Sequence, residues 1–530
     1  MTARQSHSLR QSDTGKQTQP KSIESPRRPT VLTIHALVAL LLAVMGVVAV
    51  AAFQNSLRAI QYPFQIDYGE GIVLWQAAHL DRLDSAYTPV TEDRVVVFHY
   101  PPAYHYVSRL GAYLTGDLLT AGRAVSTLAS MAIALLVLAQ VLYATPGERT
   151  WTSIGLAALA ALLCFLSANQ RLWSTVMRVD ILGVAFAFGG VFLFTLSWRY
   201  GNAIWFSGVL LALGAFTKQT LITAPLACLL VALMLDRRRA LQLFATLAGF
   251  AAIAVLLLTI LTHGEFLKHT VQYNVNPFSL HRLLQQWRVN LMGKAGITTL
   301  AVVFVAYLAT TLWRTGRSQS EHVSTESRFW LTAATWSVYF LTSLLVTVSS
   351  GKQGSAFNYF IEWNAICAVL SGLAFLLLLK EMALSRISFS LLLAMAFPIV
   401  CVSESVVTFK TPLGWIRDVP NAEQTEWLEN EQKVADFIKQ ANGPVFSDDL
   451  LPIVRSGKDL EGEPAIMTAL SYAGVWDQTA FVAKIRRGHF DRIVVENAIP
   501  EMFTPEMMQA IEDTYPNVHN VGHYKLFEKP

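Results

Sequence analysis

The chain has 530 residues, of which 53% are hydrophobic and only 15% are charged. Soluble globular domains carry about 25% charged residues. This composition therefore excludes an ordinary soluble enzyme and a disordered protein, and it indicates a polytopic membrane protein with some extramembrane mass. The net charge of +4 hides an asymmetry, because the first 402 residues carry +12 and the residues from Ser403 onward carry −8. A basic part followed by an acidic, less apolar part predicts two compartments.

The N-terminal 30 residues are polar and basic, and they predict a disordered tail. Apolar runs long enough to cross a bilayer then follow one another up to residue 402. The run 202–235 is too long for one span, so we divide it at Lys218 and Gln219 into two short helices. The resulting prediction is about eleven spans, within residues 32–53, 121–144, 152–168, 179–198, 202–235, 240–262, 296–313, 328–348, 361–380 and 386–402.

Lysine and arginine gather in alternate short loops, for example at Arg149, at Arg199 and in the run 237–239. The excess of cationic residues in cytoplasmic loops sets the orientation of a membrane protein. We therefore expect a multi-pass protein of the inner (plasma) membrane with a cytoplasmic N-terminus, residues 1–30, and a membrane domain, residues 31–402. The segments expected outside are the loops 54–120, 263–295 and 349–360 and the C-terminal residues 403–530.

The C-terminal residues 403–530 alternate amphipathic helical patterns with short apolar runs, which predicts a small α/β domain. Within it, Asp448 and Asp449 follow an apolar run. They could be catalytic, but the favoured interpretation is a turn that ends a strand on a solvated acidic surface. We expect this domain to recognise an acceptor or to cover a site.

The first external loop contains two carboxylates three residues apart, Asp67 and Glu70. At the start of a helix this spacing places both on one face. Gly69 and Gly71 flank Glu70 and allow a backbone or a substrate to come close. Asp67 alone could be a helix N-cap, but the pair beside an apolar interface favours a functional role.

Further along the same loop, the sequence Phe98-His99-Tyr100-Pro101-Pro102 leads into a helix that carries Tyr104. Aromatic residues at this level can bind a substrate or can anchor the protein in the membrane interface. The histidines of this loop lack a third ligand at metal-binding spacing, so no zinc site is expected.

Charged residues recur at the outer ends of later spans. Arg178 and Asp180 lie at the start of one span, where a charge is costly unless it is paired or used. Lys218 and Gln219 interrupt the run 202–235. Lys218 can contact a phosphate, although snorkelling of its ammonium group is the alternative.

The loop at 349–360 is rich in glycine and serine and contains Lys352. Asn358, Tyr359 and Glu362 begin the helix that follows. A glycine-rich turn with a lysine suits an anionic headgroup, but the spacing of a soluble phosphate-binding loop is absent.

These motifs occur in a fixed order: D-x-x-E-G in the first external loop, then Y-P-P, R-x-D, T-K-Q and G-K-x-G-x-x-x-N-Y-x-x-E. Their order and their shared side resemble the GT-C class of integral-membrane glycosyltransferases. The similarity is to bacterial family-39-like members related to protein mannosyltransferases and aminoarabinose transferases, and it covers roughly residues 30–380.

The resemblance implies transfer of a sugar from a polyprenyl-phosphate carrier to an acceptor outside the membrane, usually with inversion. It places the catalytic acid in the first external loop, which matches Asp67 or Glu70. Many members of the class have adjacent Asp and Glu residues at this place, whereas here Gly69 precedes Glu70 and the aspartate lies three residues back. Which carboxylate is the base therefore stays open.

The chemistry of sugar transfer agrees with this reading. A carboxylate must take the proton of the attacking hydroxyl, and the lipid phosphate that leaves requires cationic donors. The predicted donor-phosphate ligands are Arg178, Lys218 and Lys352. The predicted substrate-binding residues are His99, Tyr100, Tyr104, Asp180, Gln219, Asn358, Tyr359 and Glu362.

No cofactor is required by this chemistry, because arginine and lysine can stabilise a lipid phosphate. A divalent ion, Mg²⁺ or Mn²⁺, held between Asp67 and Glu70 is the alternative. The expected partners are the lipid-linked sugar donor, the bilayer and a lipid, glycan or protein acceptor, with no nucleic acid.

Two other classes of protein have the same composition, namely a lipid or solute transporter and a non-catalytic protein that binds a lipid-linked glycan. Transporters place charges near the middle of the bilayer and show inverted repeats. Here the spans are nearly free of charges in mid-helix and no repeat is visible, so the enzyme is the favoured prediction.

Overall fold

The computed structural model describes residues 28–292, 294–315, 325–352, 354–383, 399–403, 422–496 and 502–530. Most of the predicted N-terminal tail and of the predicted span 386–402 lies outside the described residues.

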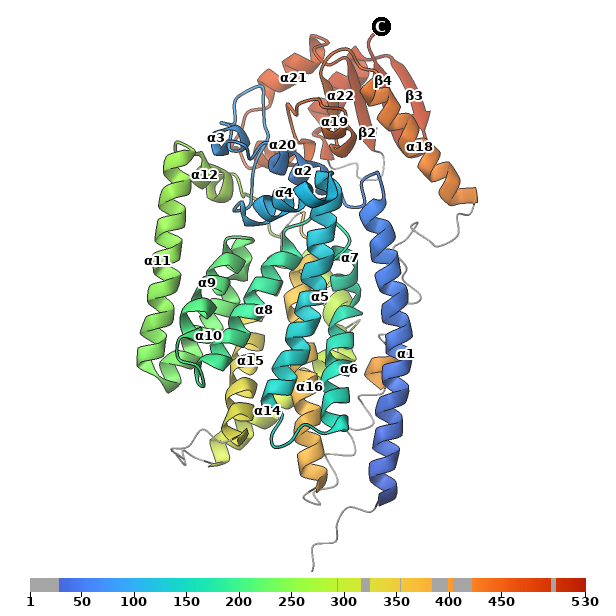
Figure 1. The fold of residues 1–530 in the computed structure, drawn as a ribbon. Helices are drawn as coiled ribbons and strands as arrows, with labels where there is room; N and C mark the ends of the chain where they lie inside the picture. The colour runs from blue at the N-terminus through green and yellow to red at the C-terminus, as the bar shows by residue number, and fades with distance from the viewer. Residues whose placement is uncertain are drawn as a thin grey trace, which may run out of the picture.

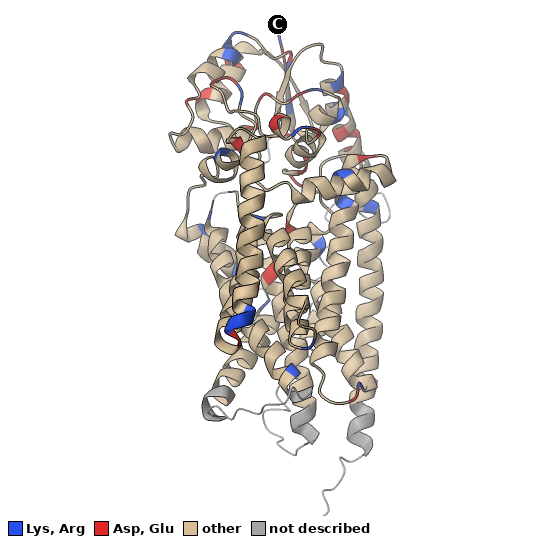
Figure 2. Ribbon diagram, turned by 60° about the vertical axis from the view of Figure 1, so that its left-hand side comes forward, with Lys and Arg blue, Asp and Glu red and all other residues tan. Residues whose placement is uncertain are grey.

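A bundle of long helices forms one end of the molecule, and the C-terminal residues form a separate layer on top of it (Figure 1). Charged residues gather in this upper layer and near the helix ends, while the middle of the bundle is mostly uncharged (Figure 2). The helices of the bundle are α1 (Arg28–Gln61), α5 (Leu118–Ala144), α6 (Trp151–Phe165), α8 (Asp180–Ser197), α9 (Ala203–Ala215), α10 (Thr223–Leu235), α11 (Arg237–Leu261), α14 (Ala295–Thr315), α15 (Thr325–Val348) and α16 (Ile361–Ala383).

The protein is a multi-pass membrane protein. Within the described residues, six helices are long and apolar enough to cross a bilayer, and α13 (Leu280–Trp287) with α14 forms a bent pair that meets the same criterion. Helices α6, α9 and α10 are apolar but shorter. At 1.5 Å per residue, α6 with its 15 residues is about 22 Å long, less than the hydrocarbon core of a bilayer.

The predicted division of the run 202–235 is present. Helix α9 ends at Ala215, and the turn η1 (Gln219–Ile222) separates it from α10, with Lys218 in extended conformation before the turn. Helix α9 packs closely on α8, because a Cβ atom on Gly190 would lie 2.6 Å from the side chain of Leu211. Small residues allow such close approach of helices in a membrane.

The loops between the long helices form short helices, of which α2 and α4 lie between the bundle and the C-terminal layer (Figure 1). Helix α4 is amphipathic, because Tyr104 and Ser108 are buried while Leu110 and Leu114 are largely exposed. The short elements are α2 (Glu70–Ala78), α3 (Leu83–Ala86), α4 (Ala103–Thr115), α7 (Ala168–Trp173), α12 (Glu265–Leu267), η2 (Lys268–Gln272), α13, η3 (Arg288–Met292), η4 (Ser349–Gly351) and η5 (Phe357–Phe360).

The C-terminal layer contains the helices and strands that the alternating pattern predicts. Its sheet has the order β1-β2-β4-β3, in which β1 and β2 are parallel and the other pairs are antiparallel. The elements are α18 (Ala422–Lys439), β1 (Val445–Ser447), α19 (Leu451–Arg455), α20 (Pro464–Tyr472), α21 (Thr479–Arg486), β2 (Arg492–Glu496), α22 (Pro505–Thr514), β3 (Asn517–Val521) and β4 (Tyr524–Glu528).

The C-terminal layer is fixed directly to the first loop. The N–H of Val95 donates to the carbonyl of Glu461, and the N–H of Glu463 donates to the carbonyl of Val95, both at 3.0 Å. A Cβ atom on Gly71 would lie 2.5 Å from the backbone nitrogen of Leu451. Gly71 is therefore required because the C-terminal layer rests against helix α2.

The favoured interpretation of Asp448 and Asp449 as residues of a solvated turn is wrong. Their exposed fractions are 2% and 1%. Asp448 accepts the N–H of Glu496, while the Tyr524 hydroxyl lies 3.1 Å from Glu431 Oε1 and 3.3 Å from Asp449 Oδ2. Helix α18 covers these carboxyl groups, so the apolar run before them could not reveal their burial.

Burial raises the pKa of Glu431 and that of Asp448 to about 7. Both groups therefore bind more protons in the folded than in the unfolded state between their ordinary pKa values and pH 7. Stability must fall as the pH rises through this interval, by up to about tenfold in the unfolding constant per pH unit and group.

We expect the amides of β4 in the full-length protein to lose hydrogen-exchange protection between pH 5 and pH 7, after correction for intrinsic rates. Glu431→Gln, which mimics the protonated group, should flatten this dependence, whereas substitution of the exposed Glu426 by Gln should leave it unchanged. A wild-type profile that does not vary with pH would contradict the expectation.

Candidate active site

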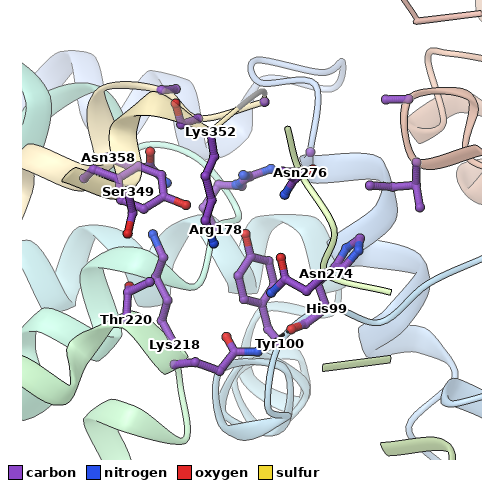
Figure 3. Close-up of a pocket in the computed structure, with 18 of the residues that line it drawn as sticks. His99, Tyr100, Arg178, Lys218, Thr220, Asn274, Asn276, Ser349, Lys352 and Asn358 are labelled. Carbon is purple, nitrogen blue, oxygen red and sulfur yellow. Dashed lines mark hydrogen bonds between the residues drawn. The ribbon is translucent and has the colours of Figure 1, made fainter. Parts of the chain in front are cut away.

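A cavity of about 700 Å³ lies where the bundle meets the C-terminal layer. Its walls come from the turn before α2, the connection between α9 and α10, the loop 349–359 and helix α20. Figure 3 shows that His99, Tyr100, Arg178, Lys218, Lys352 and Asn358 surround this space. Residues far apart in the sequence are thus brought to one site.

Asp67 lies on the cavity wall, in the turn between α1 and α2. Its Oδ2 atom accepts the N–H of Gly69 at 3.0 Å and lies 3.1 Å from Nη1 of Arg178. The guanidinium of Arg178 occupies the space that a Cβ atom on residue 69 would need. Burial raises the pKa of Asp67 above its ordinary value, although Arg178 opposes the rise. A carboxylate with raised pKa is a better proton acceptor.

Glu70 has a different environment. Its side chain is fully buried, does not line the cavity, and forms two hydrogen bonds with the guanidinium of Arg123, at 2.8 and 2.7 Å. The N–H groups of Ile66 and Met177 each donate to it at 2.7 Å. Of the two carboxylates whose roles the sequence left open, Asp67 therefore faces the cavity, whereas the oxygens of Glu70 are occupied by internal hydrogen bonds.

Lys218 and Asp180 form a buried ion pair at the cavity. Asp180 also accepts a hydrogen bond from Nδ2 of Asn358 at 2.8 Å, and the ammonium group of Lys218 lies 4.5 Å from the centre of the Tyr359 ring. Lys218, Asn358 and Tyr359 line the cavity, whereas Asp180 does not. Asp180, which the sequence predicts as a substrate-binding residue, thus lies behind the cavity wall and orients residues that line it.

Lys352 and Arg282 add two further cations to the cavity wall. Arg282 projects from helix α13 and donates to the carbonyl of Ser355 at 3.0 Å. Among the residues that the structure describes, no ion pair involves either cation. They are therefore the cavity cations most available to an anionic ligand.

His99, Tyr100 and Gln219 line the cavity as predicted for residues that contact a ligand. Gln219 donates to the carbonyl of His99 at 2.6 Å. Burial lowers the pKa of His99 to about 4, so its ring is neutral at pH 7 and adds no charge to the site.

Tyr104 and Glu362, which the sequence predicts as substrate-binding residues, lie outside the cavity lining. The Tyr104 hydroxyl donates to the carbonyl of Gly122 at 2.8 Å. Glu362 accepts hydrogen bonds from the hydroxyls of Tyr339 and Thr223, at 2.6 and 2.7 Å. Tyr104 thus joins α4 to α5, and Glu362 joins α16 to α10 and α15.

Two residues at the cavity were missed in the sequence. Arg282 belongs to a loop helix whose entry into the site no motif indicated. Glu463 comes from the C-terminal layer, is 4% exposed, and has an Oε2 atom without a hydrogen-bond partner among the described residues. Burial raises its pKa to about 8. The glycine and proline on either side of Glu463 gave only a turn signal.

The described residues contain no group of three His, Cys, Asp or Glu side chains arranged to hold a metal ion. The four cysteines are buried singly in the bundle.

The chain matches one family of known proteins, and its fold matches several solved structures. Residues 99–263 match the family described as dolichyl-phosphate-mannose-protein mannosyltransferase. No curated protein sequence matches the chain.

The fold is similar to that of ArnT from Cupriavidus metallidurans. The apo structure is 13% identical, with a TM-score of 0.54 over 91% of this chain and 97% of that chain. The structure bound to undecaprenyl phosphate is 12% identical, with a TM-score of 0.53 over 95% and 98%. The apo oligosaccharyltransferase from Archaeoglobus fulgidus is 10% identical, with a TM-score of 0.53 over 90% and 72%.

The protein therefore has the fold of the GT-C glycosyltransferases. The resemblance to GT-C members related to protein mannosyltransferases and aminoarabinose transferases, stated from the order of motifs, is confirmed.

Substitutions of the two carboxylates of the first loop should have different effects on the free energy of unfolding. Glu70→Gln leaves the buried Arg123 without its counterion, which costs about 3–5 kcal/mol of unfolding free energy. Asp67→Asn affects a partly exposed pair and should cost about 1 kcal/mol or less. Thermal unfolding of the purified variants measures the difference. Equal unfolding temperatures for Glu70→Gln and the wild type would contradict the structural role of Glu70.

Proposed function

We propose that the protein is a glycosyltransferase that moves a sugar from a polyprenyl-phosphate carrier to an acceptor, with Asp67 as the base. The observation that supports it best is one cavity in which a carboxylate of raised pKa lies among four cations, Arg178, Lys218, Arg282 and Lys352. A phosphate leaving group and a hydroxyl nucleophile need these two kinds of group together.

The cations divide into two groups by their partners. Arg178 and Lys218 neutralise Asp67 and Asp180. Lys352 and Arg282 have no carboxylate partner among the residues described, so we assign the principal contacts with the donor phosphate to them. Lys218 and Arg178 contribute further positive potential in a partly buried site, where it is less screened than in water.

The lipid tail of the donor has an apolar route into the cavity. Ile222, Leu226, Leu345 and Val346 line the cavity wall. Ile222 and Leu345 are also 61% and 62% exposed on the surface of the bundle. An isoprenoid chain lying between η1–α10 and α15 would reach the cations with its phosphate while its tail stays in lipid. The binding of undecaprenyl phosphate by the similar ArnT structure supports this class of donor.

The reaction follows as a single displacement. The oxygen of the acceptor hydroxyl forms a bond to the anomeric carbon while the bond from that carbon to the phosphate oxygen breaks. The bonding electrons leave with the lipid phosphate, which the cations stabilise, and Asp67 takes the hydroxyl proton. One base suffices, and the configuration at the anomeric carbon is inverted.

We place this reaction at the external face of the inner membrane, with the N-terminus in the cytoplasm and the C-terminal layer outside. The distribution of lysine and arginine among the short loops supports this orientation. We propose further that no divalent metal is required, since the cavity cations can supply the charge stabilisation.

Asp67→Asn should lower sugar transfer at least about 100-fold, because it removes the general base, while undecaprenyl phosphate still binds. Mass spectrometry of envelope glycolipids and glycoproteins in a deletion strain, complemented with each variant, measures transfer. Substitution of the exposed Asp84 by Asn is the matched control. A wild-type amount of glycan in the Asp67→Asn strain would refute the role of Asp67 as the base.

Loss of sugar transfer by membranes treated with a chelator would refute the metal-free mechanism.

Lys352→Gln and Arg282→Gln should each weaken binding of undecaprenyl phosphate about tenfold, since a charge-assisted hydrogen bond contributes about 1.5–3 kcal/mol. Native mass spectrometry of the purified protein gives the Kd. Lys268→Gln, at a half-exposed lysine away from the cavity lining, should leave it unchanged. Equal affinities for all variants would show that the donor phosphate does not contact Lys352 or Arg282.

A further inference from the structure

The cavity has two unlike walls. Lys218, Lys352 and Asn358 lie on one side, and the ribbon of the C-terminal layer borders the opposite side, with Arg178 between them (Figure 3). We name the second side the α20 wall. It consists of Glu463, Ala465, Ile466, Thr468, Ala469 and Met502.

The α20 wall contains no lysine or arginine. The hydroxyl of Thr468 already donates to the carbonyl of Met502 at 2.8 Å. The polar side chain that remains available is Glu463, which is 4% exposed and whose Oε2 atom has no partner among the described residues. Burial raises the pKa of Glu463 to about 8, although Arg178 and the Tyr68 hydroxyl oppose the rise. In its protonated form the carboxyl group can both donate and accept a hydrogen bond.

The direction of the displacement indicates which wall binds the donor phosphate and which binds the acceptor. This inference rests on the proposed function. In an inverting displacement the nucleophile must approach the anomeric carbon from the side opposite the leaving group. With the phosphate on the side of Lys352, the nucleophile arrives from the α20 wall. Asp67 pairs with Arg178, which lies between the two walls, so the base is within the path of the incoming hydroxyl.

We propose that the α20 wall is the acceptor subsite and that it selects a neutral hydroxyl, carried beside an apolar face, against a phosphate. A phosphate on this wall would meet the Glu463 carboxyl group, while the cation that acts on Glu463, Arg178, is already paired with Asp67. This is unfavourable in a buried site. A hydroxyl satisfies Glu463, and the small apolar side chains Ala465, Ile466 and Ala469 leave room beside it.

The wall is held rigidly, as a specificity determinant must be. Backbone hydrogen bonds join Glu461 and Glu463 to Val95 at 3.0 Å. The indole N–H of Trp75 donates to Asp459 at 2.9 Å. These contacts tie the residues just before α20 to the loop that carries Asp67.

Paired cysteine reporters test this assignment in the full-length protein. Ala469→Cys places a thiol on the α20 wall, and Ser349→Cys places one on the cationic side, where Ser349 lines the cavity. Both native positions are partly exposed, while all native cysteines of the described chain are buried. A maleimide therefore reports each wall separately.

Methyl glucoside, the neutral probe, should slow modification of the Ala469→Cys variant by about threefold at a concentration of a few times its Kd. It should leave the Ser349→Cys variant unaffected. Inorganic phosphate should give the reverse pattern. Combining Glu463→Ala with Ala469→Cys should abolish the protection by glycoside, whereas Glu463→Gln should retain it.

Protection of the Ala469→Cys variant by phosphate, or its lack of protection by the glycoside, would overturn the proposed selectivity. Undecaprenyl phosphate binding that is absent from the wild-type protein would instead refute the proposed donor, so the two failures are distinguishable.

Discussion

The buried ion pair between Arg123 and Glu70 is the interaction on which the geometry of the site depends. Arg123 also donates to the carbonyls of Ala59, Tyr62 and Phe64. The pair thus joins the end of α1, the turn before α2 and helix α5. Its net contribution to stability is limited by the cost of desolvating both charges. What it provides is a fixed turn, and Asp67 projects from that turn into the cavity.

The same constraint explains how charge is distributed around the cavity. A carboxylate that is buried or half-buried requires a counterion, and Glu70, Asp67 and Asp180 each have one, in Arg123, Arg178 and Lys218. Glu463 is the exception among the carboxyls at the site, and its raised pKa lets it meet the same constraint by binding a proton. The ligand-binding capacity of the site therefore follows from which charges the protein leaves without an internal partner.

The sequence allowed the class of fold and a good part of the site to be predicted. Hydrophobic length located the six long apolar helices, and Lys218 and Gln219 marked the break between α9 and α10, because polar residues stand out against an apolar background. Asp67, Arg178 and Lys352 were identified for the same reason. The burial of Asp448 and the entry of Glu463 into the cavity depend on tertiary contacts between distant segments. The different environments of Asp67 and Glu70 also could not be predicted from the sequence, because they depend on Arg123, which lies 53 residues beyond Glu70 in the chain.

The approach of Leu451 to Gly71 and the position of α20 at the cavity have a consequence for biosynthesis. The turn that carries Asp67 is made early in the chain, but the α20 wall comes from Glu463, α20 and Met502, which are synthesised after the helices of the bundle. A molecule whose helices have formed, but whose last segment has not yet packed against the first loop, contains Asp67 and the cations without a closed cavity. Packing of the C-terminal layer against the first loop is therefore the step that completes the cavity.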